Sequence, residues 1–375
     1  MTRHADARHL AVFMSFSGAG GVERMVLNLV EGFVAAGYTV DLLAIRADSA
    51  HLRALPAGVN LIDLGVRHSG FAVFPLVRYL QREQPAALLA AKDRAIRAAV
   101  VARRLAGVQT RIVGRLGTNL SAALEGRAGL SRWMRTAPMR WIYPVVDKVV
   151  CVSEGVLEDT ARLAGLTAGQ LTVIRNPVVT PRLGELAGES VDHAWAHDDS
   201  VPLILGAGRL TEQKDFDTLV RAFAIVRGAR PARLVILGDG RLRSKLEARI
   251  NELGLKDDVA LPGFTSNPYA WMARADLFVL SSAWEGSPNV LTEALALGIP
   301  SVSTDCPSGP REVLADGRFG PLVPVGDAGA LGAAMLDTLA SPLNADTLRS
   351  AVVEYSQAAS AAAYLVELGL DATKG

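Results

Sequence analysis

The sequence predicts an α/β protein made of two Rossmann-like, doubly wound domains that face each other across a cleft. The chain has 375 residues, more than a single typical domain contains. In each half, short apolar runs alternate with amphipathic stretches, which is the pattern of βαβ units in a parallel sheet. Between the halves, the segment 179–202 is rich in proline, glycine and charged residues, as linkers are. We therefore expect domains over 1–178 and 203–345, this linker between them, and a helical tail over 346–375.

The first domain is expected to begin with an apolar strand, Leu10–Phe16, and a glycine-rich turn. The next stretch has apolar residues at steps of three and four, which predicts a helix: Val22, Met25, Val26, Leu29, Val30, Phe33 and Val34. Gly37 suits the C-terminal cap of that helix. A further helix is expected at 94–107, and further strands at 38–45, 86–91, 110–115, 147–153 and 171–177.

The second domain repeats the alternation. We expect strands at 202–208, 232–240, 259–263, 275–282 and 300–305, and helices at 215–228, 241–254 and 288–297. Each unusual cluster of polar residues comes just after an expected strand. Ligands of open parallel sheets bind at those strand ends.

Composition excludes several classes of protein. The formal net charge is +1, which argues against a nucleic-acid binder. The two cysteines, Cys151 and Cys306, lie far apart without metal-ligand spacing, so a reducing, cytoplasmic location is the simplest expectation. No apolar run is long enough to predict a membrane span, and the first residues lack the apolar core of a signal peptide.

The segment Ser281–Pro300 carries two glutamates eight positions apart, Glu285 and Glu293. Glu285 falls in the loop after a strand, and Glu293 at the edge of the apolar stripe of the next helix, where we expect partial burial. Carboxylates in these places suit hydrogen bonds from ligand hydroxyl groups. The alternative is a loop cap and an ordinary surface carboxylate.

Helix-start signals stand between these glutamates. Ser287 suits the N-cap and Pro288 the first helical position, so the helix is expected to run from about Pro288 to Leu297. The backbone N–H groups near Asn289 and Val290 would then form an anion site.

Two further loops are candidates for phosphate binding. Arg209 and Lys214 follow the first strand of the second domain, and each would interact with a phosphate by roughly 4 kcal/mol at about 4 Å. The alternative is an exposed loop with ordinary charges. Gly18, Gly20 and Gly21 lie in the first turn of the chain, but Glu23 replaces the third glycine of a dinucleotide motif, which weakens the case for such a cofactor.

Together these segments resemble the retaining glycosyltransferases of family 4, or glycosyl transferases group 1, which have the GT-B fold. The matching pieces follow the family's order over most of the chain: GAGGVERMVLNL, VSEGV, VIRNPV, GAGRLTEQKDFDTLVRAF, LVILGDGRLRSKLE, LPGF, and the long run from ADLFVLSSAWEGSPNVLTEAL to VPVGD. The long run is the most specific, because it holds the Glu285–Glu293 spacing.

The resemblance implies roles for matched residues in binding a nucleotide-sugar. Arg209 and Lys214 would bind the donor diphosphate, Glu293 the ribose and Glu285 the hydroxyls of the transferred sugar. The remaining implied contacts are backbone at Gly286, Asn289 and Val290 to sugar and phosphate, Phe264 beside the base, and Gly20 and Gly21 beside the diphosphate.

The sequence departs from the family pattern in one place. Many members carry a sugar-contacting histidine near the position of Gly117, where this chain has none. Arg115 and Asn119 are the nearby polar candidates. Lys92 and Asp93 follow another expected strand and could face the acceptor.

The resemblance implies a retaining transferase with a nucleotide-sugar donor, UDP first and GDP or ADP as alternatives. The acceptor would be a sugar on a growing glycan, free or lipid-linked. We expect no cofactor and no metal, because two cations can do what a divalent ion does elsewhere and no Asp-x-Asp motif occurs. Two rival classes remain: a non-hydrolysing UDP-sugar epimerase of similar architecture, and a non-catalytic nucleotide-binding module.

One segment suggests contact with a membrane. Leu124–Lys148 interleaves arginines with tryptophan, leucine and methionine, a composition that suits the headgroup region of an anionic membrane. This hypothesis predicts a peripheral protein on the inner face of the cytoplasmic membrane. The alternative is that the aromatic residues pack into the first domain while the arginines lie in water.

Overall fold

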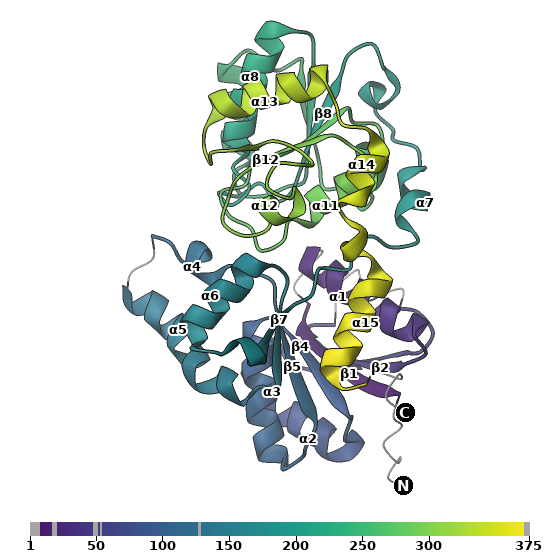
Figure 1. Cartoon of the computed structure of the whole chain (residues 1–375), viewed down its shortest axis with the longest axis vertical. Helices are drawn as coiled ribbons and strands as arrows, with labels where there is room; N and C mark the ends of the chain where they lie inside the picture. The colour runs from purple at the N-terminus through teal and green to yellow at the C-terminus, as the bar shows by residue number, and fades with distance from the viewer. Residues whose placement is uncertain (1–7, 17–20, 48–51, 53–54, 127–128, 371–375) are drawn as a thin grey trace. The chain divides into compact units, whose positions relative to one another are not determined.

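The structure, a computed structural model, describes residues 8–16, 21–47, 52, 55–126 and 129–370. The chain forms two compact units, one of Met1–Val178 with Glu354–Gly375 and one of Val179–Val353. Each unit is a parallel sheet flanked by helices (Figure 1). Two doubly wound α/β domains are therefore confirmed.

The first unit contains a seven-stranded parallel sheet in the order β3-β2-β1-β4-β5-β6-β7. Its strands are β1 (His9–Ser15), β2 (Thr39–Ile45), β3 (Val59–Asp63), β4 (Ala87–Ala91), β5 (Arg111–Leu116), β6 (Lys148–Cys151) and β7 (Leu171–Val173). Its helices are α1 (Gly21–Ala35), α2 (Val73–Glu83), α3 (Asp93–Ala106), α4 (Leu120–Ala123), α5 (Gly129–Ile142), α6 (Glu154–Ala164) and α15 (Gln357–Leu368). Short 3-10 turns lie at Tyr143–Val145, Ala168–Gln170 and Val353–Tyr355.

Both faces of this sheet are buried, which explains the continuous apolar runs of its strands. Along β1, Ala11 and Phe13 join the core under α2 and α3, whereas Leu10, Val12 and Met14 join the core under α1 and α15. The helix α1 buries the stripe expected from its periodicity and packs closely on α15. A methyl group at Gly32 would come within 2.8 Å of the Ala361 Cβ.

The second unit contains a six-stranded parallel sheet in the order β10-β9-β8-β11-β12-β13. Its strands are β8 (Leu203–Ala207), β9 (Arg233–Leu237), β10 (Val259–Gly263), β11 (Leu277–Leu280), β12 (Ser301–Thr304) and β13 (Leu322–Val323). Its helices are α7 (Leu183–Ala187), α8 (Phe216–Ala229), α9 (Arg243–Glu252), α10 (Pro268–Met272), α11 (Asn289–Ala296), α12 (Pro310–Val313), α13 (Ala328–Ala340) and α14 (Ala345–Ser350), with a 3-10 turn at Ala194–His197. Residues of α8 and α13 cover one face with an apolar core.

Two segments differ from their expected form. The segment 179–202 contains α7 and a 3-10 turn and belongs to the second unit. The tail over 346–375 is divided, because α14 belongs to the second unit and α15 to the first. The reason for the second difference is packing, since α15 buries Ala361, Tyr364, Leu365 and Leu368 against the first sheet. Within the described residues, no helix is both long enough and apolar enough to cross a membrane.

Candidate active site

The strand order of the second sheet reverses between β8 and β11. The chain runs outward from β8 through β9 and β10, then returns to place β11 on the other side of β8. Loops at such a reversal diverge and leave room for a ligand at the carboxyl ends of the strands. Arg209 and Lys214 follow β8, and Glu285 follows β11. The three residues predicted to be catalytic therefore come from the two strands that flank the reversal.

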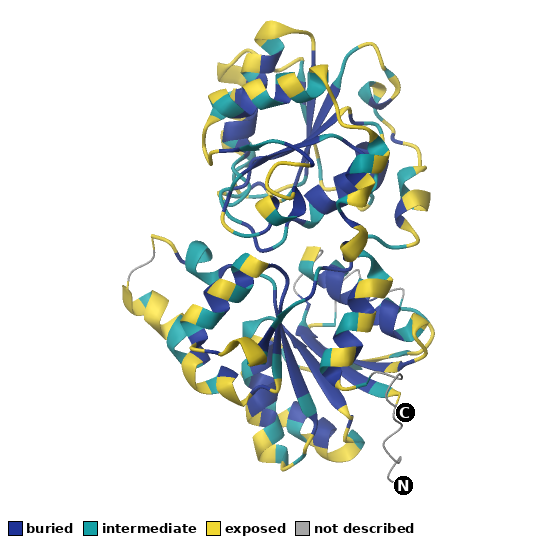
Figure 2. Cartoon of the chain, in the orientation of Figure 1, coloured by how far each residue is buried: buried dark blue, intermediate teal, exposed yellow. Residues whose placement is uncertain are grey.

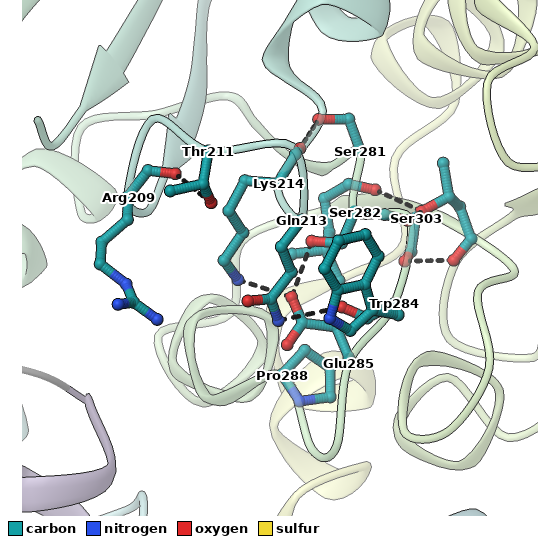
Figure 3. A network of polar contacts seen from close by, with 12 residues as sticks. Arg209, Thr211, Gln213, Lys214, Ser281, Ser282, Trp284, Glu285, Pro288 and Ser303 are labelled. Carbon is teal, nitrogen blue, oxygen red and sulfur yellow. Dashed lines mark hydrogen bonds and ion pairs between the residues drawn. The ribbon is translucent and has the colours of Figure 1, made fainter. Parts of the chain in front are cut away.

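Lys214 and Glu285 form an ion pair at the centre of this site. The Lys214 Nζ lies 2.6 Å from the Glu285 Oε1, and the Ser282 hydroxyl donates to the same oxygen at 2.7 Å (Figure 3). Glu285 is 6% exposed, so little water reaches this oxygen and the two donors take the place of water. The carboxylate is held in one place before any ligand hydroxyl reaches it.

Hydrogen bonds between the two loops hold the ion pair in position (Figure 3). The Ser281 hydroxyl donates to the Lys214 carbonyl oxygen at 2.8 Å, and the Gln213 side-chain amide donates to the Trp284 carbonyl oxygen at 3.0 Å. Gly208 leaves space for the lysine, because a Cβ there would lie 2.9 Å from the Lys214 Cε. Gln213, Ser281 and Ser282 could not be recognised from the sequence as site residues, since their contacts are made across the two loops.

Arg209 differs from Lys214 in having no fixed partner. Its side chain is exposed, and Figure 3 shows its guanidinium lying apart from the Lys214–Glu285 pair. Among the described residues, no hydrogen bond or ion pair of this guanidinium is found. One cation of the site is therefore bound to the protein, and the other faces solvent.

Glu293 is more deeply buried than the sequence predicted. It is 0% exposed, on α11, and its Oε1 accepts a hydrogen bond of 3.3 Å from the Tyr269 hydroxyl of α10. The expectation of a partly buried residue at the edge of the stripe was wrong, because α10 packs over that side of the helix. Its assignment to the ribose remains a prediction.

The helix α11 begins one residue later than expected. It starts at Asn289 with Pro288 as the N-cap, and Gly298 follows its end with a φ of 81°. The Ser287 hydroxyl does not cap the helix, and this buried oxygen has no hydrogen-bond partner among the described residues. Buried hydroxyls usually have a partner, so Ser287 is a candidate ligand contact that the sequence analysis treated only as a cap.

The other residues predicted to contact the donor lie at the start of this helix and after β10. Gly286 is buried, and Asn289 and Val290 are half-buried in the first turn of α11. Phe264 directly follows β10 and is 65% exposed. An aromatic ring that keeps an open face can stack on a nucleobase.

The first sheet reverses between β1 and β4, and residues of interest follow both strands. Gly21 is the exposed first residue of α1, while Gly20 lies outside the described residues. Lys92 follows β4 with a φ of 79°, and its Nζ donates to the Ser15 carbonyl oxygen at 3.0 Å. Positive φ is unusual for a lysine, and local contacts must hold it there.

Asp93, Arg115 and Asn119 each have a structural partner. Asp93 accepts from the Tyr143 hydroxyl at 2.8 Å and pairs with Arg97 on its own helix. The Asn119 side chain caps α4 by accepting from the Ala122 N–H at 3.0 Å. A ligand-contacting role for these residues stays a prediction.

Arg115 occupies the space beside Gly117, the position that departs from the family pattern. Its guanidinium is 2% exposed and donates to the Asn176 Oδ1 at 2.6 Å. A Cβ at Gly117 would lie 3.2 Å from the Arg115 Nη1. The arginine therefore fills the place from which a side chain at residue 117 would start.

The two cysteines are not suited to nucleophilic chemistry. Burial, reinforced by the nearby Glu285 carboxylate, raises the pKa of the Cys306 thiol to about 12 despite the opposing effect of Lys214. Burial also raises the pKa of Cys151 to about 12. Both thiols stay protonated at neutral pH and are poor nucleophiles. In the described part of the chain, no group of three histidine, cysteine or acidic side chains could hold a metal ion.

The two sheets and the paired reversal points are the architecture of GT-B glycosyltransferases, and comparison with solved structures supports this class. The lipopolysaccharide outer core galactosyltransferase WaaB aligns with a TM-score of 0.70 at 20% identity, over 96% of this chain and 99% of that one. Anabaena HepE in complex with UDP aligns with a TM-score of 0.73 at 19% identity, over 96% and 99%. These likenesses show that the fold is GT-B.

The sequence comparisons give the family. Residues 19–182 match the model of Glycosyltransferase Family 4, and residues 201–341 match that of Glycosyl transferases group 1. The chain belongs to this family of glycosyltransferases.

Two curated relatives show the range of similarity. An N-acetylgalactosaminyltransferase of Campylobacter jejuni, which acts on N-acetylgalactosamine-N,N'-diacetylbacillosaminyl-diphospho-undecaprenol, is 35% identical over 233 residues. That match covers 62% of this chain and 60% of the relative. The lipopolysaccharide core biosynthesis glycosyltransferase LpsE of Rhizobium meliloti is 28% identical over 328 residues, or 84% of each chain. None of the matches supports the alternative of an epimerase.

Proposed function

We propose that the protein transfers a sugar from a UDP-sugar to a hydroxyl group of a lipid-linked glycan, with retention of configuration. The observation that carries the proposal is the cluster at the β8–β11 reversal, where Lys214 pairs with the buried Glu285 and the exposed Arg209 lies on the same loop as Lys214. A cation pair next to a carboxylate suits a ligand that has both a diphosphate and sugar hydroxyls.

The cations would act on the leaving group. As the bond between the sugar C1 and the diphosphate oxygen breaks, negative charge grows on that oxygen, and Arg209 and Lys214 would stabilise it. The start of α11 would add peptide N–H groups and the positive end of its dipole. We expect no metal ion and no cofactor for this step.

The two glutamates would divide the hydroxyl groups of the donor. Glu285 would accept hydrogen bonds from the transferred sugar, and Glu293 from the ribose. Phe264 would stack on the base. We choose UDP over GDP and ADP because HepE, which has a similar fold, was solved with UDP and with UDP-glucose. The similarity supports the choice of nucleotide and not that of the sugar.

In a retaining transfer the acceptor attacks the face of the sugar from which the diphosphate leaves. The acceptor oxygen forms the new bond to C1, the old bond to the diphosphate oxygen breaks, and the acceptor proton passes to the departing diphosphate. This scheme comes from the resemblance to retaining family members. It requires no nucleophilic side chain of the protein.

The relatives support a lipid-linked acceptor. The Campylobacter protein acts on a diphospho-undecaprenol-linked sugar, and LpsE is named for lipopolysaccharide core biosynthesis. We propose that the enzyme works at the cytoplasmic face of the membrane, where such acceptors are assembled.

The test is a titration followed by an incubation. UDP, GDP and ADP are titrated calorimetrically, and the protein is then incubated with a panel of UDP-sugars in the absence of any acceptor. Selective binding of UDP, with slow release of UDP and no change in the sugar, would support a transferase that hydrolyses its donor. Formation of an epimer would indicate an isomerase, and failure to bind any of the three nucleotides would refute the proposal.

A further inference from the structure

The helix α5 has its apolar side facing outward. It spans Gly129–Ile142, and of its 14 residues only Met139 is buried. Figure 2 shows exposed residues along most of this helix. A surface helix of a folded domain normally turns its apolar stripe to the core, so this orientation needs a reason.

The exposed apolar residues form one continuous stripe. The exposed Leu130, Trp133, Met134 and Trp141, with the half-buried Ala137 between them, follow the spacing i, i+3, i+4, i+7 and i+11, which places them within an arc of about 100°. Trp133 is 64% exposed and Trp141 82% exposed. Large tryptophan side chains left in water on one face mark an interaction surface.

Polar contacts, rather than a buried stripe, attach the helix to the domain. The Arg97 guanidinium of α3 donates to the Arg135 carbonyl oxygen at 2.7 Å, and the Arg140 Nε donates to the Leu163 carbonyl oxygen at 3.4 Å. Met139, on the opposite side from the tryptophans, joins the core. The apolar stripe is therefore available to a partner.

A cavity of about 400 Å³ opens along one edge of the stripe. Its lining includes Arg132 and Arg140 of α5 and Arg162 of α6, together with Ser121, Thr136 and Trp133. Among the described residues that line it there are three arginines and no carboxylate. One of the three arginines already has an acidic partner. Arg162 pairs with Asp159 at 2.6 Å, and the Asp159 carboxylate also accepts from two backbone N–H groups at the start of α4.

The charge of the cavity therefore comes mainly from Arg132 and Arg140. Arginine binds phosphate oxygens through two parallel N–H groups, and a hydroxyl such as that of Ser121 or Thr136 can add a further donor. Next to it, tryptophan and leucine suit the boundary between headgroups and acyl chains. The cationic cavity and the apolar stripe together match an anionic phospholipid surface. A free anion would contact only the cavity, and an apolar partner would contact only the stripe.

We infer that α5 docks on an anionic membrane, with its apolar stripe at the acyl boundary and a lipid phosphate in the arginine cavity. The inference rests on the proposed function, since it supplies the contact through which a lipid-linked acceptor would be reached. It assigns the cavity to phospholipid phosphate, a role distinct from the diphosphate site of the second unit.

The experiment is co-sedimentation of the whole chain with vesicles. Vesicles of phosphatidylcholine alone are compared with vesicles of equal parts phosphatidylcholine and phosphatidylglycerol, at about 0.05 M and about 0.5 M salt. The cavity variant is Arg132→Ser with Arg140→Ser, and the stripe variant is Trp133→Ser with Trp141→Ser. Binding to the anionic vesicles at low salt is expected, with at least a tenfold loss in each variant.

Matched controls separate this surface from general effects. Arg230→Ser with Lys256→Ser removes two exposed cations of the second unit, and Phe74→Ser removes an exposed aromatic residue of α2. Both controls should sediment as the parent does. Circular dichroism should be unchanged in every variant, because the replaced side chains are exposed. Thermal unfolding should be unchanged as well, except for a small decrease in the cavity variant, which loses the long Arg140–Leu163 hydrogen bond.

Several results would overturn the inference. One is that the parent does not sediment with anionic vesicles. Another is that the charge control and the cavity variant lose vesicle binding equally. A third is that inorganic phosphate, at the phosphate concentration of the vesicles, releases all of the bound protein, which would show a site for free phosphate. UDP titration distinguishes this inference from the proposed function. A parent that binds UDP but no vesicle refutes only the docking surface, and one that binds vesicles but no nucleotide refutes only the transferase.

Discussion

Replacement of Lys214 by methionine should destabilise the second unit, even though the residue is predicted to bind a ligand. The change removes the ammonium that lies 2.6 Å from the Glu285 carboxylate and keeps most of the apolar side-chain volume. Only the Ser282 hydroxyl would then donate to that oxygen. The side chain of Glu285 is 8% exposed, so water can replace little of the lost interaction.

The expected loss follows from this burial. Removing one partner of a buried ion pair costs about 3–5 kcal/mol, because the remaining charge is left uncompensated. The second unit spans Val179–Val353. For a unit of that size, 1 kcal/mol shifts the melting temperature by about 2–4 °C, which gives a decrease of about 6–20 °C.

The Glu285→Gln variant should lose less, since the remaining lysine side chain is 16% exposed and can reach water. The double variant should be more stable than Lys214→Met alone, because no buried charge is left without a partner.

The assay is scanning calorimetry of the parent, the two single variants and the double variant. Lys256→Met serves as the control, because it removes an exposed lysine from the same unit. Equal melting temperatures for Lys214→Met and Lys256→Met would refute the reasoning. So would a double variant that loses the sum of the two single losses, since the pair would then have no coupling energy.

Three further predictions concern single residues. Arg209→Ala should weaken UDP at least about tenfold in calorimetric titration while the melting temperature stays the same, because the side chain is exposed; unchanged affinity would contradict its phosphate role. Glu293→Gln should weaken UDP by about 1.5–3 kcal/mol through loss of a charged acceptor, whereas Glu285→Gln should leave UDP binding near that of the parent; equal losses would rule out the division of roles. Burial alone would raise the pKa of Asp41. Hydrogen bonds from His9, Asn60 and Tyr79 outweigh that effect and hold the pKa below its ordinary value of 3.8. The ionised Asp41 therefore stabilises the first unit above about pH 4, and this stabilisation is lost as the pH falls through the lower pKa of the folded state. The Asp41→Asn variant should show a smaller acid-induced fall in the melting temperature of the first unit than the parent. An equal fall in parent and variant would contradict this prediction.

Local pattern was sufficient to predict most strands of both sheets, although not β3 or β13, and the loops that carry the candidate site. The apolar runs that became β8 and β11 and the polar residues after them could be recognised without any long-range information, because strand ends of a parallel sheet share one edge. This placed Lys214 and Glu285 at strand ends of the same sheet, and the structure adds that the two strands are neighbours and that the residues form an ion pair.

What the sequence could not predict depends on which element packs on which. The spacing of Ala361, Tyr364, Leu365 and Leu368 predicts an amphipathic helix, but no local signal says that this helix covers the first sheet. The burial of Glu293 likewise depends on α10, an element distant in sequence. The stripe of α5 could be read from the sequence, but the side of the helix that meets the domain could not, because it is set by Met139 and by backbone acceptors.

The return of α15 to the first sheet affects the order in which a nascent chain can fold. The second unit is continuous, so all of its residues emerge from the ribosome before α15 does. Until α15 emerges, the first unit is incomplete, and the apolar residues of α1 and β4 that later contact α15 are uncovered. Domains usually complete in the order of synthesis, the N-terminal one first. In this chain vectorial synthesis favours the opposite order, and stalled nascent chains of increasing length would show protease resistance in the second unit before the first.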